Sequence, residues 1–122
     1  MAGVPADGLS HLRVTLTETG YLGPGRADLL ELIGSTGSIS AAGKAMGMSY
    51  KRAWGLVQAL NEGFGIVLVE SSRGGAAQGG AQLTEAGKVV LGHYRQMQDK
   101  TRAAIAGDVA ALRAMLDIAS RK

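Results

Sequence analysis

The chain of 122 residues contains no cysteine, only two prolines and only five aromatic residues. Without cysteine it forms neither disulfides nor thiolate metal sites, which fits a reducing compartment. Leucine, isoleucine, valine, alanine and methionine must therefore build its core. No apolar run is long enough to cross a bilayer, and the start, MAGVPADGLS, lacks the basic and apolar blocks of a secretory signal. We expect one cytoplasmic domain over 1–122, with no membrane partner.

The groups that catalysis and metal binding require are also scarce. The two histidines, His11 and His93, lie far apart, and neither stands at metal-ligand spacing from a second histidine or a carboxylate. Ser71 and Ser72 have no neighbouring base, and no pair of carboxylates shares a face with a reason to be desolvated. We therefore expect no catalytic residues, no metal and no enzyme activity.

Positive charge exceeds negative charge only slightly. Thirteen Lys and Arg residues against ten Asp and Glu residues give a net charge of +3, which many proteins without a nucleic-acid ligand also have. The positions are more informative, because most carboxylates lie outside the middle of the chain. That middle holds four basic residues: Lys44, Lys51, Arg52 and Arg73. This placement favours a polyanionic partner.

The spacing of apolar residues predicts the elements of the N-terminal half. We expect a flexible tail over 1–10. HLRVTLTET, residues 11–19, alternates apolar and polar side chains and predicts a strand, which can join a later hairpin as its third strand. After GYLGPG, apolar residues at helical spacing predict a helix from Pro24 that ends at Gly37, where glycine can adopt a left-handed conformation.

Two further helices, separated by a glycine turn, follow this first helix. Ser38 is a good N-cap for a short helix that Gly47 ends, and Ser49 is a good N-cap for a helix over 50 to about 62. The longer helix has a buried apolar face at i, i+4 and i+7: Ala53, Val57 and Leu60. Helix, glycine turn and helix in this order predict a helix-turn-helix.

A β-hairpin with a long tip comes next. IVLVESS predicts a strand, RGGAAQGG a glycine-rich loop, and AQLT a short return strand. A hairpin placed directly after the third helix is the wing of a winged helix. The predicted fold is therefore mainly α with a small β-hairpin wing, and its winged-helix core covers 11–83.

The last predicted helix covers 84–119, with Thr84 as its N-cap. Gly107 and Asp108 can divide it into two helices. Its apolar residues repeat every seven positions, and the stripe is longer than a small winged domain can cover. We therefore predict a homodimer whose interface is formed by Val90, Tyr94, Met97, Ile105, Leu112, Met115 and Leu116. The alternative is a helix that folds back on its own domain.

The start of the third helix holds the best candidates for DNA contacts. A helix N-terminus has free N–H groups and a positive dipole that attract phosphate, and it is the end that enters a major groove. Four side chains on the exposed face are candidates for contacts with base edges or backbone: Tyr50, Lys51, Trp54 and Gln58. Five others suit phosphates: Ser38, Ser40, Lys44, Ser49 and Arg52. The alternative is a solvated basic helix with Trp54 folded onto its neighbours.

The glycine-rich tip of the wing has no Lys-Ser or Lys-Thr after its glycines, so it is not a phosphate-binding loop of the P-loop type. We expect Arg73, Gln78 and bare backbone amides to lie along a groove or a phosphate strand, because glycine permits close approach. The alternative interpretation is a mobile hairpin tip.

In combination, MSYKRAW, GGAAQGG and LTEAGK resemble the DNA-binding domain of the ModE-type molybdate-dependent transcriptional regulators. The resemblance covers about Leu12 to Lys100, and the chain is more distantly similar to the winged helix-turn-helix of LysR-type regulators. It implies a dimer that binds operator DNA through Ser49 to Trp54 and the wing, and that controls genes for molybdate uptake and molybdenum enzymes. Full-length members also carry C-terminal molybdate-binding domains, whose oxyanion motif is not present here. We therefore expect a stand-alone DNA-binding domain with no cofactor and no direct binding of molybdate.

Two other functions stay open at this point. The chain can be an adaptor that binds a larger regulator through its last helix, or a direct sensor of a small oxyanion effector such as molybdate. We favour a homodimeric transcriptional regulator that binds double-stranded DNA at a palindromic operator, with half-sites ~34 Å apart or a multiple of that distance.

Overall fold

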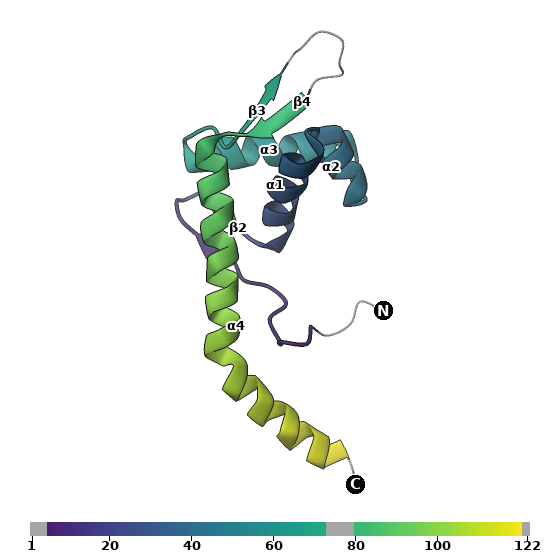
Figure 1. Cartoon of the computed structure of the whole chain (residues 1–122), viewed down its shortest axis with the longest axis vertical. Coiled ribbons are helices and arrows are strands. Elements are labelled where there is room, and N and C mark those ends of the chain that lie inside the picture. The colour runs from purple at the N-terminus through teal and green to yellow at the C-terminus, as the bar shows by residue number, and fades with distance from the viewer. Residues whose placement is uncertain (1–4, 73–79, 121–122) are drawn as a thin grey trace.

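The computed structural model describes residues 5–72 and 80–120, and it places a winged-helix core at one end of a long helix (Figure 1). The strands form two separate antiparallel pairs, β1 with β2 and β3 with β4. A hairpin that follows the third helix confirms the predicted fold class, mainly α with a small wing. The elements are β1 (Val14–Thr15), β2 (Tyr21–Leu22), α1 (Pro24–Thr36), α2 (Ile39–Ala45), α3 (Tyr50–Phe64), β3 (Val69–Ser72), β4 (Gly80–Leu83) and α4 (Glu85–Ser120).

Local signals in the sequence determine where the helices begin and end. The Ser38 hydroxyl accepts a hydrogen bond from the Ala41 N–H at 3.0 Å, and the Ser49 hydroxyl accepts one from the Arg52 N–H at 3.1 Å. Each serine supplies the acceptor that a first helical turn lacks. Gly37 has a φ of 73° and ends α1. Both predicted N-caps and the end of α1 are confirmed.

Helices α2 and α3 approach each other closely at a glycine. A Cβ atom built on Gly43 would lie 2.8 Å from the Cβ of Ala53, a distance at which side chains cannot coexist without a shift. Gly47, with a φ of 73°, turns the chain between the two helices. The close crossing therefore depends on small residues at the contact, as a helix-turn-helix requires.

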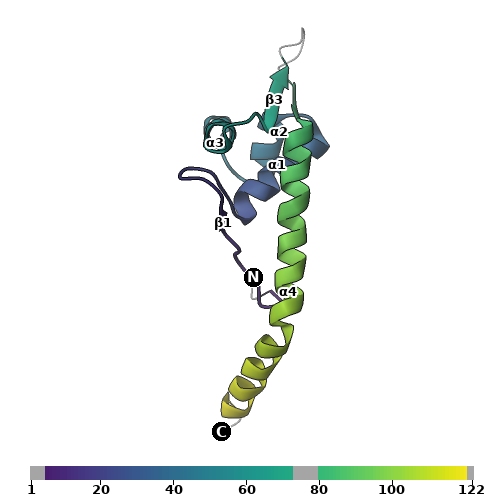
Figure 2. The same ribbon diagram turned by 90° about the vertical axis from the view of Figure 1, so that its left-hand side faces the viewer.

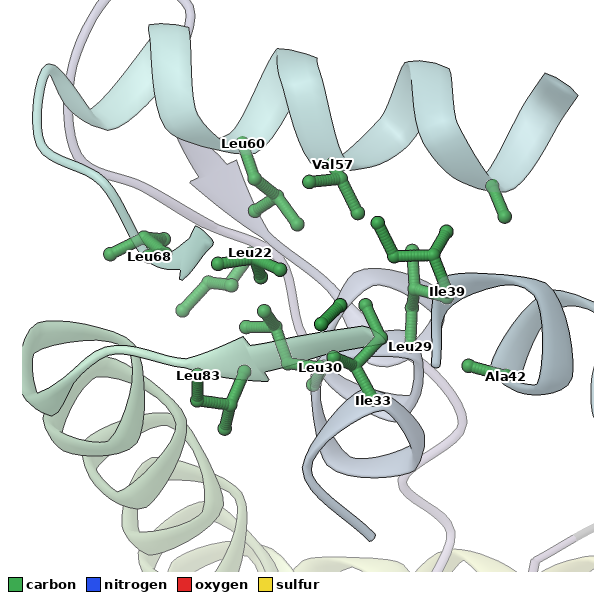
Figure 3. Packing of buried hydrophobic residues seen from close by; sticks show 14 of the residues in the cluster. Leu22, Leu29, Leu30, Ile33, Ile39, Ala42, Val57, Leu60, Leu68 and Leu83 are labelled. Atoms are coloured by element: carbon green, nitrogen blue, oxygen red, sulfur yellow. The ribbon is translucent and has the colours of Figure 1, made fainter. Parts of the chain in front are cut away.

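The core lies between α1, α3 and the wing (Figure 3). Ala53, Val57 and Leu60 of α3 are buried, as the sequence predicts. Figure 3 shows Val57 and Leu60 pointing toward the cluster that holds Leu29 and Leu30 of α1. The base of the wing closes the same cluster. The largest fully buried aliphatic side chains are Leu22, Leu29, Leu30, Ile33, Leu60 and Leu68.

The first strand is much shorter than predicted, and it does not join the wing. Only Val14 and Thr15 pair, with Leu22 and Tyr21 of β2. The turn between them is tied to the end of α3, because the Thr17 hydroxyl donates to the Gly63 carbonyl at 2.6 Å. The expected third strand of the wing is therefore wrong, since this hairpin is held beside α3 instead.

The sequence leaves open whether Gly107 and Asp108 divide the last helix, and in the structure α4 is continuous through both residues. Thr84 caps its first turn by accepting a hydrogen bond from the Gly87 N–H at 3.0 Å. Figures 1 and 2 show that the C-terminal half of α4 bends but continues far beyond the helix-turn-helix. Within residues 5–72 and 80–120, no helix is both long enough and apolar enough to cross a membrane.

The segment before β1 lies against α4, which corrects the expected flexible tail at 1–10 for residues 5–9. Asp7 pairs with Arg102 at 2.8 Å, and the guanidinium of Arg113 donates to the carbonyls of Pro5 and Ala6. Gly8 lies on Val109, whose methyl groups would be 3.0 and 3.1 Å from an added Cβ. Residues 1–4 lie outside the described part of the chain.

Candidate nucleic-acid interface

The N-terminal turns of α3 present an exposed polar face opposite the core. Lys51 and Arg52 are exposed, and Tyr50 and Trp54 retain 55% and 42% of their accessible surface. Gln58, one turn further along, is half-buried. The prediction that Tyr50, Lys51 and Trp54 point away from the core is thus confirmed, because the apolar stripe of α3 occupies the other side of the helix. Trp54 is not folded into the core.

Polar groups at the starts of α2 and α3 border this face. The hydroxyl oxygens of Ser38 and Ser49 accept the cap hydrogen bonds, so each hydroxyl keeps a proton that it can donate to an anion. Ser40 and Lys44 are exposed on α2. The five predicted phosphate ligands therefore lie on the two helices of the helix-turn-helix, together with the candidates on α3.

The predicted wing contacts, Arg73 and Gln78, fall within 73–79 and lie outside the described residues. What the structure does show is the base of the wing. The Asn61 side chain accepts hydrogen bonds from the Leu68 and Val69 N–H groups at 2.8 and 3.2 Å and donates to the Val69 carbonyl at 3.1 Å. This side chain ties α3 to β3 and fixes the direction in which the wing leaves the domain.

Ion pairs are concentrated at α4 and are absent from the described part of the helix-turn-helix face. Arg95 of α4 bonds Asp28 and Glu31 of α1 at 2.9 and 2.8 Å. Burial lowers the pKa of Arg95, but the hydrogen bonds that its guanidinium donates to Asp28 and Glu31 outweigh this effect and raise the pKa overall. Among the described residues, no carboxylate pairs with the three basic side chains of α2 and α3: Lys44, Lys51 and Arg52.

A second group of cations, which the sequence does not reveal, lies beside α3. The guanidinium carbons of Arg13 and Arg26 lie 3.7 and 3.9 Å from the centre of the Tyr21 ring. They line a cleft together with His11 and Arg52. Arg26 lies near the start of α1, far from α3 in the sequence, and no sequence motif includes it. Only the fold brings these residues together. We call this feature the basic cleft.

The predicted interface residues on α4 divide into three groups. Leu112, Met115 and Leu116 keep 56–62% of their surface exposed, whereas Val90, Met97 and Ile105 are half-buried. Tyr94 is fully buried in its own domain, and its hydroxyl donates to the Leu12 carbonyl at 2.7 Å. Its predicted place in a dimer interface is therefore wrong, because the same stripe also packs on the winged helix.

Within the described residues, no three His, Cys, Asp or Glu side chains come close enough together to hold a metal ion. The arrangement instead offers hydrogen-bond donors and positive charge on an exposed surface. Such a surface suits binding of a large anion rather than chemistry on a small one.

Comparisons with known proteins agree with this arrangement. A family model described as "Bacterial regulatory helix-turn-helix protein, lysR family" matches residues 27–88. The chain is 46% identical over 89 residues to the molybdenum-pterin-binding protein MopB of Rhodobacter capsulatus, which covers 72% of this chain and 33% of that protein. It is 37% identical over 92 residues to the DNA-binding transcriptional dual regulator ModE of Escherichia coli K12, covering 73% of this chain and 35% of that one.

A solved structure supports the same conclusion for the fold. The CbnR_DBD–DNA complex matches with a TM-score of 0.56 and 27% identity, over 74% of this chain and 95% of that one. The chain spans about a third of the length of the curated relatives it matches. The match therefore covers about a third of each of these curated relatives and nearly all of the CbnR_DBD chain.

Proposed function

Because the chain belongs to the bacterial regulatory helix-turn-helix proteins of the lysR family, we propose that it is a transcriptional regulator that binds duplex DNA through α3. One observation carries the proposal. The exposed start of α3 holds Lys51 and Arg52 without a carboxylate partner among the described residues, whereas Arg95 and Arg102 of α4 form ion pairs with acids. Free cations at a helix N-terminus favour a polyanion there.

The roles of the side chains follow from their places on α2 and α3. We assign contacts with base edges to the exposed face of α3, at Tyr50, Lys51, Trp54 and Gln58, because a recognition helix enters the major groove by its first turns. We assign phosphate contacts to the groups that border this face: Ser38, Ser40, Lys44, Ser49 and Arg52. Arg73 and Gln78 of the wing complete the proposed contacts on the DNA backbone.

The proposed regulator acts as a homodimer through α4. Leu112, Met115 and Leu116 form an exposed apolar end on that helix. A second copy of the chain would bury this end, as is common in symmetric homodimers. Two α3 helices would then face two half-sites of a palindromic operator. Since the proposed ligand is chromosomal DNA, we place the protein in the cytoplasm.

The genes that it controls are proposed to concern molybdenum, since the relative from Rhodobacter capsulatus carries molybdenum-pterin binding in its name. Direct binding of molybdate stays outside this proposal. A thermal-shift titration with molybdate measures it, because a ligand that binds only the folded state raises the melting temperature. We expect no shift.

The first test of DNA binding is selection from random duplexes, which should return an enriched palindromic motif. On that motif, the double variant Lys51→Ala/Arg52→Ala should bind much more weakly than wild type. If each protomer neutralises about four phosphates, log K should fall with log salt at a slope of roughly −7 for the dimer. The measurement is fluorescence anisotropy over a salt series.

A charge-matched control separates a site effect from a change in net charge. Lys88 and Lys100 are exposed on α4, and Lys88→Ala/Lys100→Ala removes the same two charges. This variant should keep most of the affinity. Equal affinity of wild type and Lys51→Ala/Arg52→Ala would refute the assignment of α3.

A further inference from the structure

We propose that the basic cleft between β1–β2, the start of α1 and the side of α3 binds a tetrahedral oxyanion of the phosphate type. It is lined by His11, Arg13, Arg26 and Arg52, and none of the described residues that form its walls is a carboxylate. The neighbouring elements β2, α1 and α3 are in contact with one another, and Figure 2 shows the β1 hairpin beside α3. The cleft is therefore formed by elements that pack on one another.

The charges in the cleft are close together and lack a counterion among the described residues. Arg13 and Arg26 both stack on Tyr21, within 4 Å of its ring centre. The ring attracts each guanidinium through its quadrupole, but it is neutral and leaves both charges uncompensated. No described carboxylate forms an ion pair with either arginine. A bound anion would supply the missing charge.

Arg26 also has hydrogen-bonding groups without partners. Its Nε and Nη1 atoms are buried and make no hydrogen bond within the described part of the chain. A buried charged donor without a partner is costly, and native structures rarely keep one. A guanidinium group can donate two parallel hydrogen bonds to the oxygens of a phosphate group. A small rotation of the Arg26 side chain toward the cleft would allow its N–H groups to donate to such an anion.

Two further features fit a small anion rather than a bulky ligand. His11 lies against Gly23, since an added Cβ there would be 3.6 Å from the imidazole atoms Cε1 and Nε2. Met46, Met48 and Leu56 supply apolar walls, which strengthen electrostatic attraction by excluding water. The cleft thus combines three arginines with partly apolar walls.

The oxyanion has two sources, a backbone phosphate of DNA or a free inorganic anion. Arg52 lines both this cleft and the shallow hollow at the start of α3, so the cleft continues the face proposed to meet DNA. The DNA source rests on the function proposed above and would extend the contact to β1–β2. The free-anion source does not depend on that function.

The test uses the full chain and two single variants, Arg26→Gln and Arg13→Gln, with Lys100→Gln as the control for net charge. Arg13 is exposed, so its variant should fold even if Arg26→Gln does not. In one experiment, binding to a random-sequence duplex of about 40 base pairs, long enough for a dimer, is measured over a salt series. If DNA supplies the phosphate, each arginine variant should reduce the slope by about one per protomer, and Lys100→Gln should leave it unchanged.

In the second experiment, melting temperatures are measured with sodium phosphate and sodium sulfate against sodium chloride of equal ionic strength. If a free anion is the ligand, phosphate should raise the melting temperature of wild type and Lys100→Gln but not of the arginine variants. A reduced salt slope in the arginine variants supports the site with DNA as the source of the oxyanion. Loss of the phosphate-dependent rise in melting temperature supports the site with a free anion as its ligand. If wild type binds DNA and neither property changes in Arg13→Gln, the oxyanion site is refuted while the DNA-binding function stands. If wild type binds no duplex, that function fails, and the second experiment alone decides the site.

Discussion

At the scale of single residues, Tyr94 joins the long helix to the winged helix. Its ring is fully buried, and its hydroxyl donates to the Leu12 carbonyl at 2.7 Å, across 82 positions of sequence. Gln98 of the next helical turn lies against the same hydroxyl. One phenol therefore fills the space between α4 and the segment before β1 and also satisfies a backbone acceptor there.

This phenol should make stability depend on pH in alkaline solution. Burial raises the pKa of Tyr94 above its usual value, so the folded state holds the proton more tightly than the unfolded state. The resulting stability is fully present below pH of about 10 and is lost as pH rises through the folded pKa. In Tyr94→Phe this particular loss should be absent, while stability at neutral pH should fall by about 1 kcal/mol with the hydrogen bond.

Urea unfolding of wild type and Tyr94→Phe at a series of pH values from neutral to about 11 measures both effects. The free energies of the two proteins should converge as pH rises. Parallel curves over the whole range would show that the ionisation of Tyr94 is not linked to folding.

At the scale of elements, the contact between α2 and α3 leaves no room for a side chain at Gly43. Gly43→Ala would place a methyl group 2.8 Å from the Cβ of Ala53, so the helices must separate. Overpacking of this kind costs about 1–3 kcal/mol, which outweighs the gain of about 1 kcal/mol in helix propensity. Thermal unfolding should show a lower melting temperature.

The matched control is Gly92→Ala in α4, where no atom lies within 4 Å of an added Cβ. It gains the same helix propensity without a clash, so it should raise the melting temperature slightly. An equal gain in both variants would mean that α2 and α3 can separate freely.

The sequence predicts those elements whose signals are local. Ser38, Ser49 and Gly37 mark helix ends because each acts on the backbone within a few residues. The place of β1 could not be predicted in this way, since it depends on the bond from Thr17 to Gly63, which are far apart in sequence. Periodicity also identifies the exposed face of α3, but it cannot reveal the basic cleft.

The stripe on α4 shows a different limit of sequence patterns. A seven-residue repeat predicts an apolar face, yet it does not say which surface that face covers. In the folded chain the N-terminal half packs on the winged helix through Tyr94, while Leu112 and Met115 beyond it stay exposed. The same seven-residue repeat thus forms both a buried and an exposed part of α4. Which part is buried depends on where the winged helix packs along the helix.

At the scale of the whole molecule, the charges are sorted between two regions. The acids Asp7, Asp28 and Glu31 neutralise arginines of α4, whereas the basic residues of α2, α3 and the basic cleft have no such partners within the described ranges. A net charge of only +3 therefore becomes a concentrated positive surface on one side. Electrostatic steering toward a polyanion depends on this local concentration rather than on the total.

The exposed end of α4 should determine the oligomeric state. If Leu112 and Met115, which are 56% and 60% exposed, are covered by a second copy, then Leu112→Asp/Met115→Asp should dissociate the dimer. Burial of one such side chain contributes about 1.5–3 kcal/mol, so the dimer should weaken by roughly tenfold or more per site. Sedimentation equilibrium measures the change.

The control for this prediction is Val89→Asp. Val89 is equally exposed near the other end of α4, so this substitution should leave the dimer intact. The core lies elsewhere, so all variants should keep the far-ultraviolet circular dichroism of wild type. An unchanged dimer in Leu112→Asp/Met115→Asp would move the interface away from this end, and the two α3 helices would then need another geometry to reach a palindromic site.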